Sequence, residues 1–437
     1  MGRVRPLETL VSAVSIAILT NGPSIAISHL YNVPLGWDRW PYIIPIGIVA
    51  LLGVFVLGRD LRIGQFRRNL WPIAVLAAYL LWCMASVTWS VAPDLTAVRS
   101  LLTAGVAAFG LWYGLCLRFK EQLLSLFFAT ATLSIWSLGL VLIQPKTHQL
   151  YPPPQFPTWH TEAFGVFGNP NSLGPVAVLS LMSSVAMWIL FPVWWSRLGV
   201  ACAAVVGVIL AIWSQSVTAI VGLVLALSAT VGAITLPFLR RVSGWVVGGT
   251  ISLATLVFWK VFFDHIGRLA PMVGADATFS SRRLIWSDVR SAIALRPWRG
   301  YGFFAFWDKE ELTAAMYKHV GIAYGSAHNS VLEVALGLGR VGLALYLALA
   351  FFMVVGIARA IWLRTSIASV AWVALAVYMI AQNSMESFVL WYSYLWALFV
   401  AATVVSSRLL TTPSSMSGVS SRVDKADSAD REPCLPA

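Results

Sequence analysis

The chain has 437 residues, of which 59% are hydrophobic and only 11% are charged, and its mean hydropathy is +0.78. A soluble globular domain does not need so much apolar sequence to fill its core, so the composition indicates an integral membrane protein. The formal net charge of +12 would suit a nucleic-acid binder. Short cytoplasmic loops of membrane proteins are also rich in Lys and Arg, however, and we therefore expect no nucleic-acid partner.

Apolar segments long enough to cross a hydrocarbon core of about 30 Å recur from the N-terminus to about Arg408. Because backbone groups in lipid must be satisfied within the segment, these spans should be helices. We predict an all-α, polytopic fold with about twelve transmembrane helices. The predicted spans are 8–29, 41–58, 70–88, 98–117, 122–144, 172–191, 198–213, 217–238, 243–263, 327–358, 366–382 and 388–407.

The charges of the loops predict the orientation of these spans. Lys and Arg follow every second span, whereas the alternate short loops hold only Arg39, Arg99 and Lys146. Both termini are therefore expected in the cytoplasm, and residues 264–327 form a long extracytoplasmic loop. Residues 1–410 make one membrane domain, and 411–437, rich in Ser and charge, are predicted to be a disordered cytoplasmic tail. The four cysteines form no obvious pair or C-x-x-C motif, so neither disulfides nor zinc are expected.

The long loop contains "TFSSRRLIWSDVRSAIALRPWRGYGFFAFW", from Thr278 to Trp307, with five arginines. The periodicity predicts an amphipathic helix that ends before Pro297. Its apolar stripe is Ile285, Val289, Ala292 and Ile293, and its polar stripe is Arg283, Ser287 and Arg290. Such a basic helix can simply rest on lipid headgroups, or its arginines can bind an anion. Arg282 lies one turn before Trp286, so its guanidinium is expected to stack on the indole with its fork facing outward, as suits a diphosphate.

Three blocks together resemble the O-antigen ligase and polymerase superfamily. They are "FGNPNSLG" (Phe167 to Gly174), "SSRRLIW" with "RPWRGYG" in the long loop, and "HNSVLEVALGLGRVG" from His328. Further stretches resemble its exopolysaccharide polymerase branch: "WSVAPDLTAVRSL", "WSQSVTAIVG", "GYGFFAFW" and "NSMESFVLWYSYLWALFV". Each block alone is a weak signal, but their order and their spacing relative to the spans make the set specific.

The resemblance implies a multi-pass glycosyltransferase of the bacterial inner membrane with its active site on the extracytoplasmic face. It would polymerise polysaccharide from polyprenyl-diphosphate-linked oligosaccharide units, or, as an O-antigen ligase, transfer the glycan to a lipid core. Its partners would be this donor, an acceptor glycan or lipid, membrane lipids and other envelope polysaccharide assembly proteins. No cofactor is expected, and no metal either, since the outer loops show no D-x-D pair or carboxylate cluster.

His328 is the predicted general base, because a neutral imidazole accepts a proton at ordinary pH. Arg282, Arg283, Arg290 and Arg340 are predicted to bind the diphosphate, and Arg340, inside an apolar run near the outer boundary, has Glu333 as a neighbour on nearly the same helix face. A structural role for Arg340 is an open alternative. Secondary substrate contacts are predicted for Asn169, Asn171, Asn329, Glu333 and Glu386. Asn169 also reads as a helix N-cap before Pro170.

The chain departs from the family at Val217, where ligases and polymerases of this type tend to carry Arg or Lys. The departure weakens the assignment of a second phosphate-binding cation, and two alternatives are open: Arg340, Arg283 or Arg290 substitutes for it, or the activity is changed or lost. Two other classes of protein compete with the enzyme. A transporter would place polar residues deep in the spans and often shows inverted repeats, which are not evident here. A non-catalytic assembly partner would keep the fold but need neither His328 nor Arg282.

Overall fold

The computed structural model describes residues 4–25, 40–145, 149–150, 162–190, 194–239, 278–320, 325–362, 367–387 and 393–411. Its first half contains α1 (Pro6–Leu19), α3 (Trp40–Asp60), α4 (Ile63–Arg68), α5 (Leu70–Ala85), a 3-10 turn η1 (Ser86–Trp89), α6 (Pro93–Cys116) and α7 (Phe119–Ile143). Next come the paired strands β1 (Gln149–Leu150) and β2 (Glu162–Ala163), the 3-10 turn η2 (Gly165–Phe167), α9 (Pro170–Leu190), α10 (Trp194–Trp213) and α11 (Val217–Leu239). The last part holds α13 (Thr278–Leu295), η5 (Phe306–Asp308), α14 (Glu310–Val320), α15 (Ser330–Trp362), α16 (Ile367–Met385) and α17 (Tyr394–Thr411).

The all-α polytopic fold is confirmed. In the described residues, eight helices are long and apolar enough to cross a membrane, and three shorter apolar helices accompany them. Each of these helices overlaps a predicted span. The predicted span 243–263 lies outside the described residues, as do 264–277 of the long loop and 412–437 of the tail.

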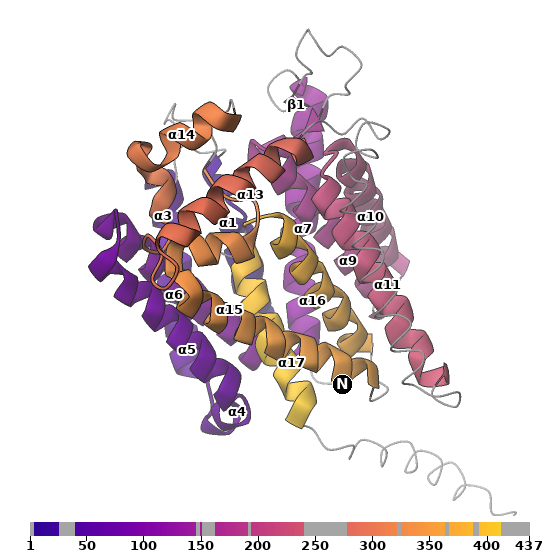
Figure 1. Ribbon diagram of the computed structural model, residues 1–437. Coiled ribbons are helices and arrows are strands. Elements are labelled where there is room, and N and C mark those ends of the chain that lie inside the picture. Colours follow the sequence, from indigo (N-terminus) through magenta and orange to yellow (C-terminus); the bar gives the residue numbers. More distant parts are fainter. Residues whose placement is uncertain are drawn as a thin grey trace, which may run out of the picture.

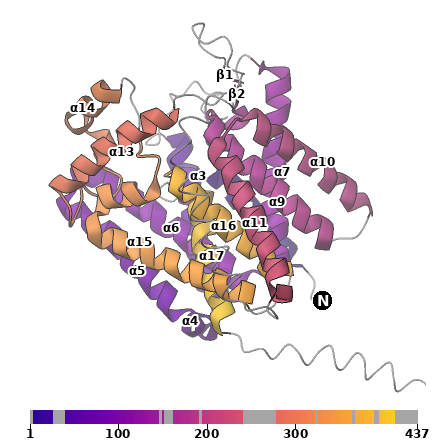
Figure 2. The ribbon, with the colours of Figure 1, turned by 45° about the vertical axis from the view of Figure 1, so that its right-hand side comes forward.

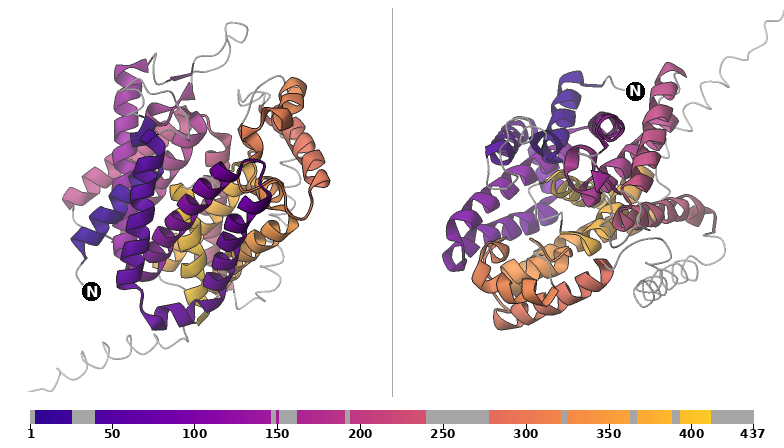
Figure 3. Two further views of the ribbon diagram at one scale, coloured as in Figure 1. Left: turned by 90° about the vertical axis from the view of Figure 1, so that its left-hand side faces the viewer. Right: turned by 90° about the horizontal axis from the view of Figure 1, so that it is seen from above.

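The helices form one bundle around α17, which is buried on all sides from Tyr394 to Val404. Such all-round burial explains why this segment is apolar without a polar face. Helices α6 and α15 pack directly on α17, and α11 packs on α16. Figure 2 shows α16 and α17 between α5 and α6 on one side and α7, α9 and α11 on the other, and the view from above in Figure 3 shows them at the centre.

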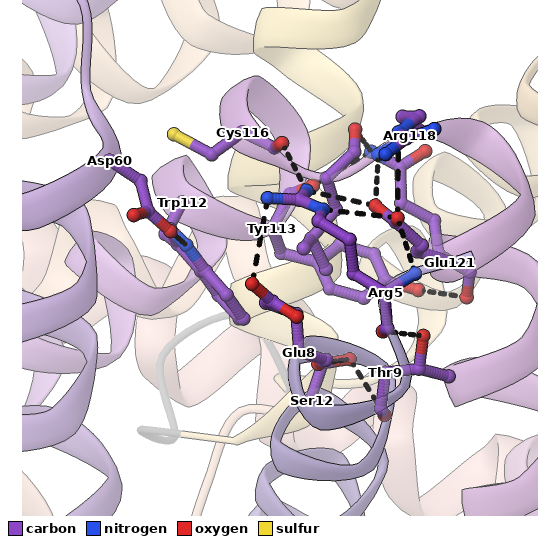
Figure 4. A network of polar contacts seen from close by, with 12 residues as sticks. Arg5, Glu8, Thr9, Ser12, Asp60, Trp112, Tyr113, Cys116, Arg118 and Glu121 are labelled. Carbon is purple, nitrogen blue, oxygen red and sulfur yellow. Dashed lines mark hydrogen bonds and ion pairs between the residues drawn. The ribbon is translucent and has the colours of Figure 1, made fainter. Parts of the chain in front are cut away.

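The segments that connect the helices lie at two opposite ends of the bundle (Figure 1). At one end lie α4 and the last turn of α17, and at the other lie β1, α13 and α14. A polar network marks the first end (Figure 4): the buried Glu121 carboxylate accepts from the Arg5 guanidinium at 2.9 Å and from the backbone N–H of Arg118, also at 2.9 Å. Since Arg5 also donates to the Cys116 carbonyl, this network ties the start of α1 to the turn between α6 and α7.

The predicted amphipathic helix is confirmed as α13. Ile285, Val289 and Ala292 are buried and pack with Tyr301, Phe306 and Leu336 in a separate apolar cluster, with Ile293 partly buried against it. This cluster seats α13 and the loop after it on the beginning of α15. Helix α13 and the loop after it are therefore packed on the bundle through their own small core.

The expected continuous span 327–358 is interrupted, which corrects the prediction. Within α15 the backbone of Gly339 has φ 66° and ψ −165°. The turn after α13 packs against the backbone of α15 at this break, where the Arg340 N–H donates to the Pro297 carbonyl at 2.8 Å. A Cβ at Gly339 would lie 2.2 Å from the Trp298 carbonyl carbon, so only glycine fits this close approach.

Candidate functional site

His328 lies in a bend directly before α15, at the same end of the bundle as α13. Its backbone φ is 47°, a left-handed conformation that costs a non-glycine residue about 1–3 kcal/mol and persists only where neighbours fix it. The preceding peptide is fixed on both sides. The Ala327 N–H donates to the Glu333 carboxylate at 2.6 Å, and the Ala327 carbonyl accepts from the Trp286 indole at 2.9 Å.

The Glu386 carboxylate, just beyond the end of α16, joins His328 to Arg282. One oxygen lies 2.8 Å from His328 Nδ1, and the other accepts from Arg282 Nη2 at 2.5 Å. Glu386 is 3% exposed and Arg282 is 8% exposed, whereas the His328 side chain is 32% exposed. Arg282, Glu386 and His328 thus form a three-residue array that is buried at the arginine end and open at the imidazole.

The charges of the array determine which imidazole nitrogen carries a proton. Burial alone would raise the pKa of the Glu386 carboxyl, but the charge of Arg282 and the contact with His328 outweigh it and lower the pKa below its ordinary value. An ionised carboxylate only accepts hydrogen bonds, so His328 Nδ1 must be the donor. In the neutral ring, Nε2 then keeps its lone pair. The array presents a proton acceptor at its open end.

Asn329 and Ser330 fasten the start of α15 to the end of α16. The Asn329 backbone N–H donates to Ser387 Oγ at 3.1 Å, its side-chain amide donates to the Ser384 carbonyl at 2.9 Å, and its Oδ1 caps the helix by accepting from the Leu332 N–H. Ser330 Oγ donates to the Glu386 carbonyl at 2.9 Å. These bonds fix the position of the imidazole relative to the Glu386 carboxylate. Asn329 therefore has a supporting structural role beside His328.

The expected outward-facing fork of Arg282 is wrong. Its Nη1 donates to the Met385 carbonyl at 3.0 Å and its Nη2 to Glu386, so the guanidinium faces α16. The Glu386 carboxylate and the Met385 carbonyl together give the guanidinium hydrogen-bond acceptors in this buried position, where an unpaired charge would be costly. The neighbouring cations Arg283 and Arg290 are exposed on the outer face of α13, as predicted.

The expected neighbourhood of Arg340 and Glu333 is also wrong. Glu333 is 4% exposed, and its carboxylate accepts from the Trp307 indole and the Ala327 N–H, each at 2.6 Å. Arg340 follows the break in α15, and its guanidinium lies 5.1 Å from the centre of the Trp298 ring. The break intervenes between the two residues, and the face relation of a continuous helix no longer applies. Glu333 supports His328, whereas Arg340 lies apart from the array.

Asn169 precedes the first turn of α9 and its Oδ1 accepts from the Asn171 N–H at 2.7 Å, in agreement with the predicted cap. Asn171 Oδ1 in turn accepts from Ser216 Oγ, at the start of α11. Gln382 donates to the Thr218 carbonyl one turn before Glu386. The N-terminal ends of α9 and α11 are thus linked through α16 to the array. Val217 begins α11 in this region.

Sequence reasoning assigns Glu386 only a substrate contact and misses its role as the partner of the imidazole. A signal for it exists. Glu386 is an acidic residue at the border of an apolar segment, where a charge normally has a specific partner. The two basic side chains that it meets lie 58 and 104 positions away, at His328 and Arg282, so pairing them needs the tertiary fold.

Residues 202–347 match a family described as O-antigen ligase. The match includes His328 and all four predicted diphosphate arginines, and it supports the expected relation to the O-antigen ligase and polymerase superfamily. It indicates a membrane enzyme of this type, whose family implies lipid-linked glycan substrates. Comparison with curated proteins finds no match.

Proposed function

We propose that this member of the O-antigen ligase and polymerase superfamily is a glycosyltransferase that polymerises polysaccharide outside the cytoplasm from polyprenyl-diphosphate-linked oligosaccharides. The observation that carries the proposal is the array of Arg282, Glu386 and His328, which holds the imidazole through Nδ1 and leaves its side chain 32% exposed. Such an arrangement suits proton removal from an acceptor hydroxyl.

In the proposed reaction, His328 Nε2 takes the proton of an acceptor hydroxyl as its oxygen attacks the anomeric carbon of the donor glycan. A glycosidic C–O bond forms, and the bond between the anomeric carbon and the diphosphate breaks. The lipid diphosphate leaves with the electron pair. Glu386 stabilises the imidazolium that results, and Arg282 holds Glu386 in place.

The leaving diphosphate gains negative charge, so cations beside it would lower the barrier. We assign this role to Arg283 and Arg290, which are exposed on α13 beside the array. Asn169 and Asn171, at the start of α9, would contact phosphate or sugar oxygens through their side-chain NH₂ groups, since the backbone N–H groups of Asn171, Ser172 and Leu173 already bond to Asn169. Arg282 would contact the donor only at the edge of the array, because both of its terminal nitrogens already bond to α16.

Ligation to a lipid core is the alternative outcome of the same chemistry, because only the acceptor differs. Within the described residues, His328 and Glu386 lie just outside the ends of two candidate spans and Arg282 lies on α13, which is not a candidate span, and this placement favours an interfacial enzyme over a transporter. We further propose that the membrane is the bacterial inner membrane and that the α13 end faces outward, as the loop charges favour.

The test is purified protein incubated with polyprenyl diphosphate oligosaccharide, with products sized by gel electrophoresis. Longer glycans on the lipid are expected of a polymerase. Transfer to an added lipid core, without longer glycans on the donor lipid, would identify a ligase instead. If the protein turns over neither substrate while remaining folded, the enzymatic proposal fails.

A further inference from the structure

A second group of cations lies at the other end of α13, where the chain turns back toward α15. Each of its three guanidiniums lies over an aromatic ring: Arg296 over Tyr301 at 4.7 Å, Arg299 over Trp89 at 5.6 Å and Arg340 over Trp298 at 5.1 Å. All three arginines are exposed. Within the described residues, none of them pairs with a carboxylate. Their positive charge is therefore available to an external anion.

The backbones at Arg299 and Arg340 lie close together although 41 positions separate the two residues in the chain. The Arg340 N–H donates to the Pro297 carbonyl, and a Cβ at Gly339 would lie 2.5 Å from the Arg299 nitrogen, so the two backbones touch. The Trp89 indole donates to the Arg299 carbonyl at 2.9 Å and holds the turn in place. We call Arg299, Arg340 and Trp298 the turn cluster.

The depth of the turn cluster fits the border between hydrocarbon and headgroups. The part of the candidate membrane span that follows the break runs from Arg340 to Arg359, about twenty residues, which measure about 30 Å at 1.5 Å each. Arg340 therefore lies at the membrane boundary. Beside it Trp298 is 61% exposed and Leu295 is 78% exposed. Exposed indoles are typical of this interfacial zone.

The turn cluster is remote from the array. Arg282 and Leu295 lie thirteen residues apart on α13, which corresponds to about 20 Å along the helix. A phosphate bound at Arg299 and Arg340 is therefore a different ligand position from a diphosphate beside His328.

We propose that the turn cluster binds the phosphate of an anionic phospholipid in the membrane leaflet at the α13 end. A guanidinium stacked on a ring keeps its N–H donors free at its edge, where it can grip phosphate oxygens in pairs. Leu295 and the open face of Trp298 offer apolar contact to the lipid chain below the headgroup. A soluble phosphate would gain the ionic contact but not this apolar one. The proposal does not depend on the glycosyltransferase activity.

The test measures lipid binding by native mass spectrometry of the detergent-purified full chain. Phosphatidylglycerol, phosphatidylcholine and glycerol 3-phosphate are the probes. The variant is Arg299→Gln with Arg340→Gln, and the matched control is Lys309→Gln with Lys318→Gln, which removes the same charge near α14. The backbone hydrogen bonds of the turn use neither guanidinium, so the variant should fold, and circular dichroism checks this.

We expect phosphatidylglycerol to bind the native and control proteins alike and the arginine variant about tenfold more weakly, which corresponds to about 1.4 kcal/mol. Unchanged binding in the folded variant would overturn the proposal. Equal binding of phosphatidylcholine, or displacement of the lipid by an equimolar amount of glycerol 3-phosphate, would also overturn it. Added salt should weaken the binding by the native protein, and salt-independent binding would contradict an ionic site even if the variant did not fold.

Discussion

Replacing Glu386 by Gln tests how the array works, because the change keeps the size of the side chain and removes its charge. The carboxylate accepts from Arg282 and from His328 through different oxygens. An amide has a single acceptor oxygen, so it can serve one of these donors while its NH₂ group faces the other. Either Arg282 loses its buried partner or the imidazole loses the contact that keeps the proton on Nδ1.

With Glu386 3% and Arg282 8% exposed, the pair is screened little by water. Removing one partner of a buried pair costs about 3–5 kcal/mol, and because the amide retains one hydrogen bond we expect about 3 kcal/mol in the free energy of unfolding. An imidazole with the wrong tautomer cannot act as base, so turnover should fall by about a hundredfold to ten-thousandfold.

The assay combines initial rates of glycan transfer with the melting temperature of the detergent-purified protein. Glu310→Gln is the matched control, since Glu310 is exposed at the start of α14. Glu386→Asp keeps the charge on a shorter side chain and should recover part of the rate. Wild-type turnover in a folded Glu386→Gln protein would refute the idea that this carboxylate orients the base.

Three further predictions concern the array and the topology. Arg282→Ala should lower activity and stability through the loss of its contacts with Glu386 and Met385, by about 1.5–3 kcal/mol per charged hydrogen bond. Arg282→Lys should rescue little, because a point charge cannot bond both groups. Full rescue by Lys in rate and melting assays would contradict this prediction. Because the pKa of Glu386 is lowered, its charge stabilises the fold above the ordinary carboxyl pKa, and this contribution should be lost as pH falls through the lowered value. The melting-temperature difference between the native protein and Glu386→Gln should therefore shrink in acid. A difference that grows in acid would contradict the argument. A reporter fused after Asp276 should signal an extracytoplasmic location, and a cytoplasmic signal would overturn the topology.

Much of the fold follows from local pattern. The stripe of Ile285, Val289 and Ala292 predicted α13 because helical periodicity acts over a few residues, and the apolar runs predicted the spans for the same reason. The break at Gly339 was not predicted. It depends on the turn at Trp298, which approaches from a distant part of the chain; Gly337 and Gly339 permit a close approach, but the sequence does not show which segment makes it.

In the candidate site, too, some features follow from local sequence and others depend on contacts between distant segments. His328 and Asn329 were found from their block, and their place before a helix followed from the span. The partner of the imidazole depended on contacts between α13, α15 and α16, and it was therefore recognised only in the structure. Arg340 shows the opposite case: its depth could be estimated from chain length, but its ring partner Trp298 could not.

The most direct test of the central claim is the single-turnover rate of His328→Gln with saturating donor, measured beside His319→Gln. His319 is a matched control, because it is another histidine at the same end of the molecule and lies 3.0 Å from the Asp288 carboxylate on the surface. If His328 is the base, its Gln variant should bind the donor normally but transfer glycan about a hundredfold to ten-thousandfold more slowly, while the control stays at the native rate. Native turnover by His328→Gln would contradict the account.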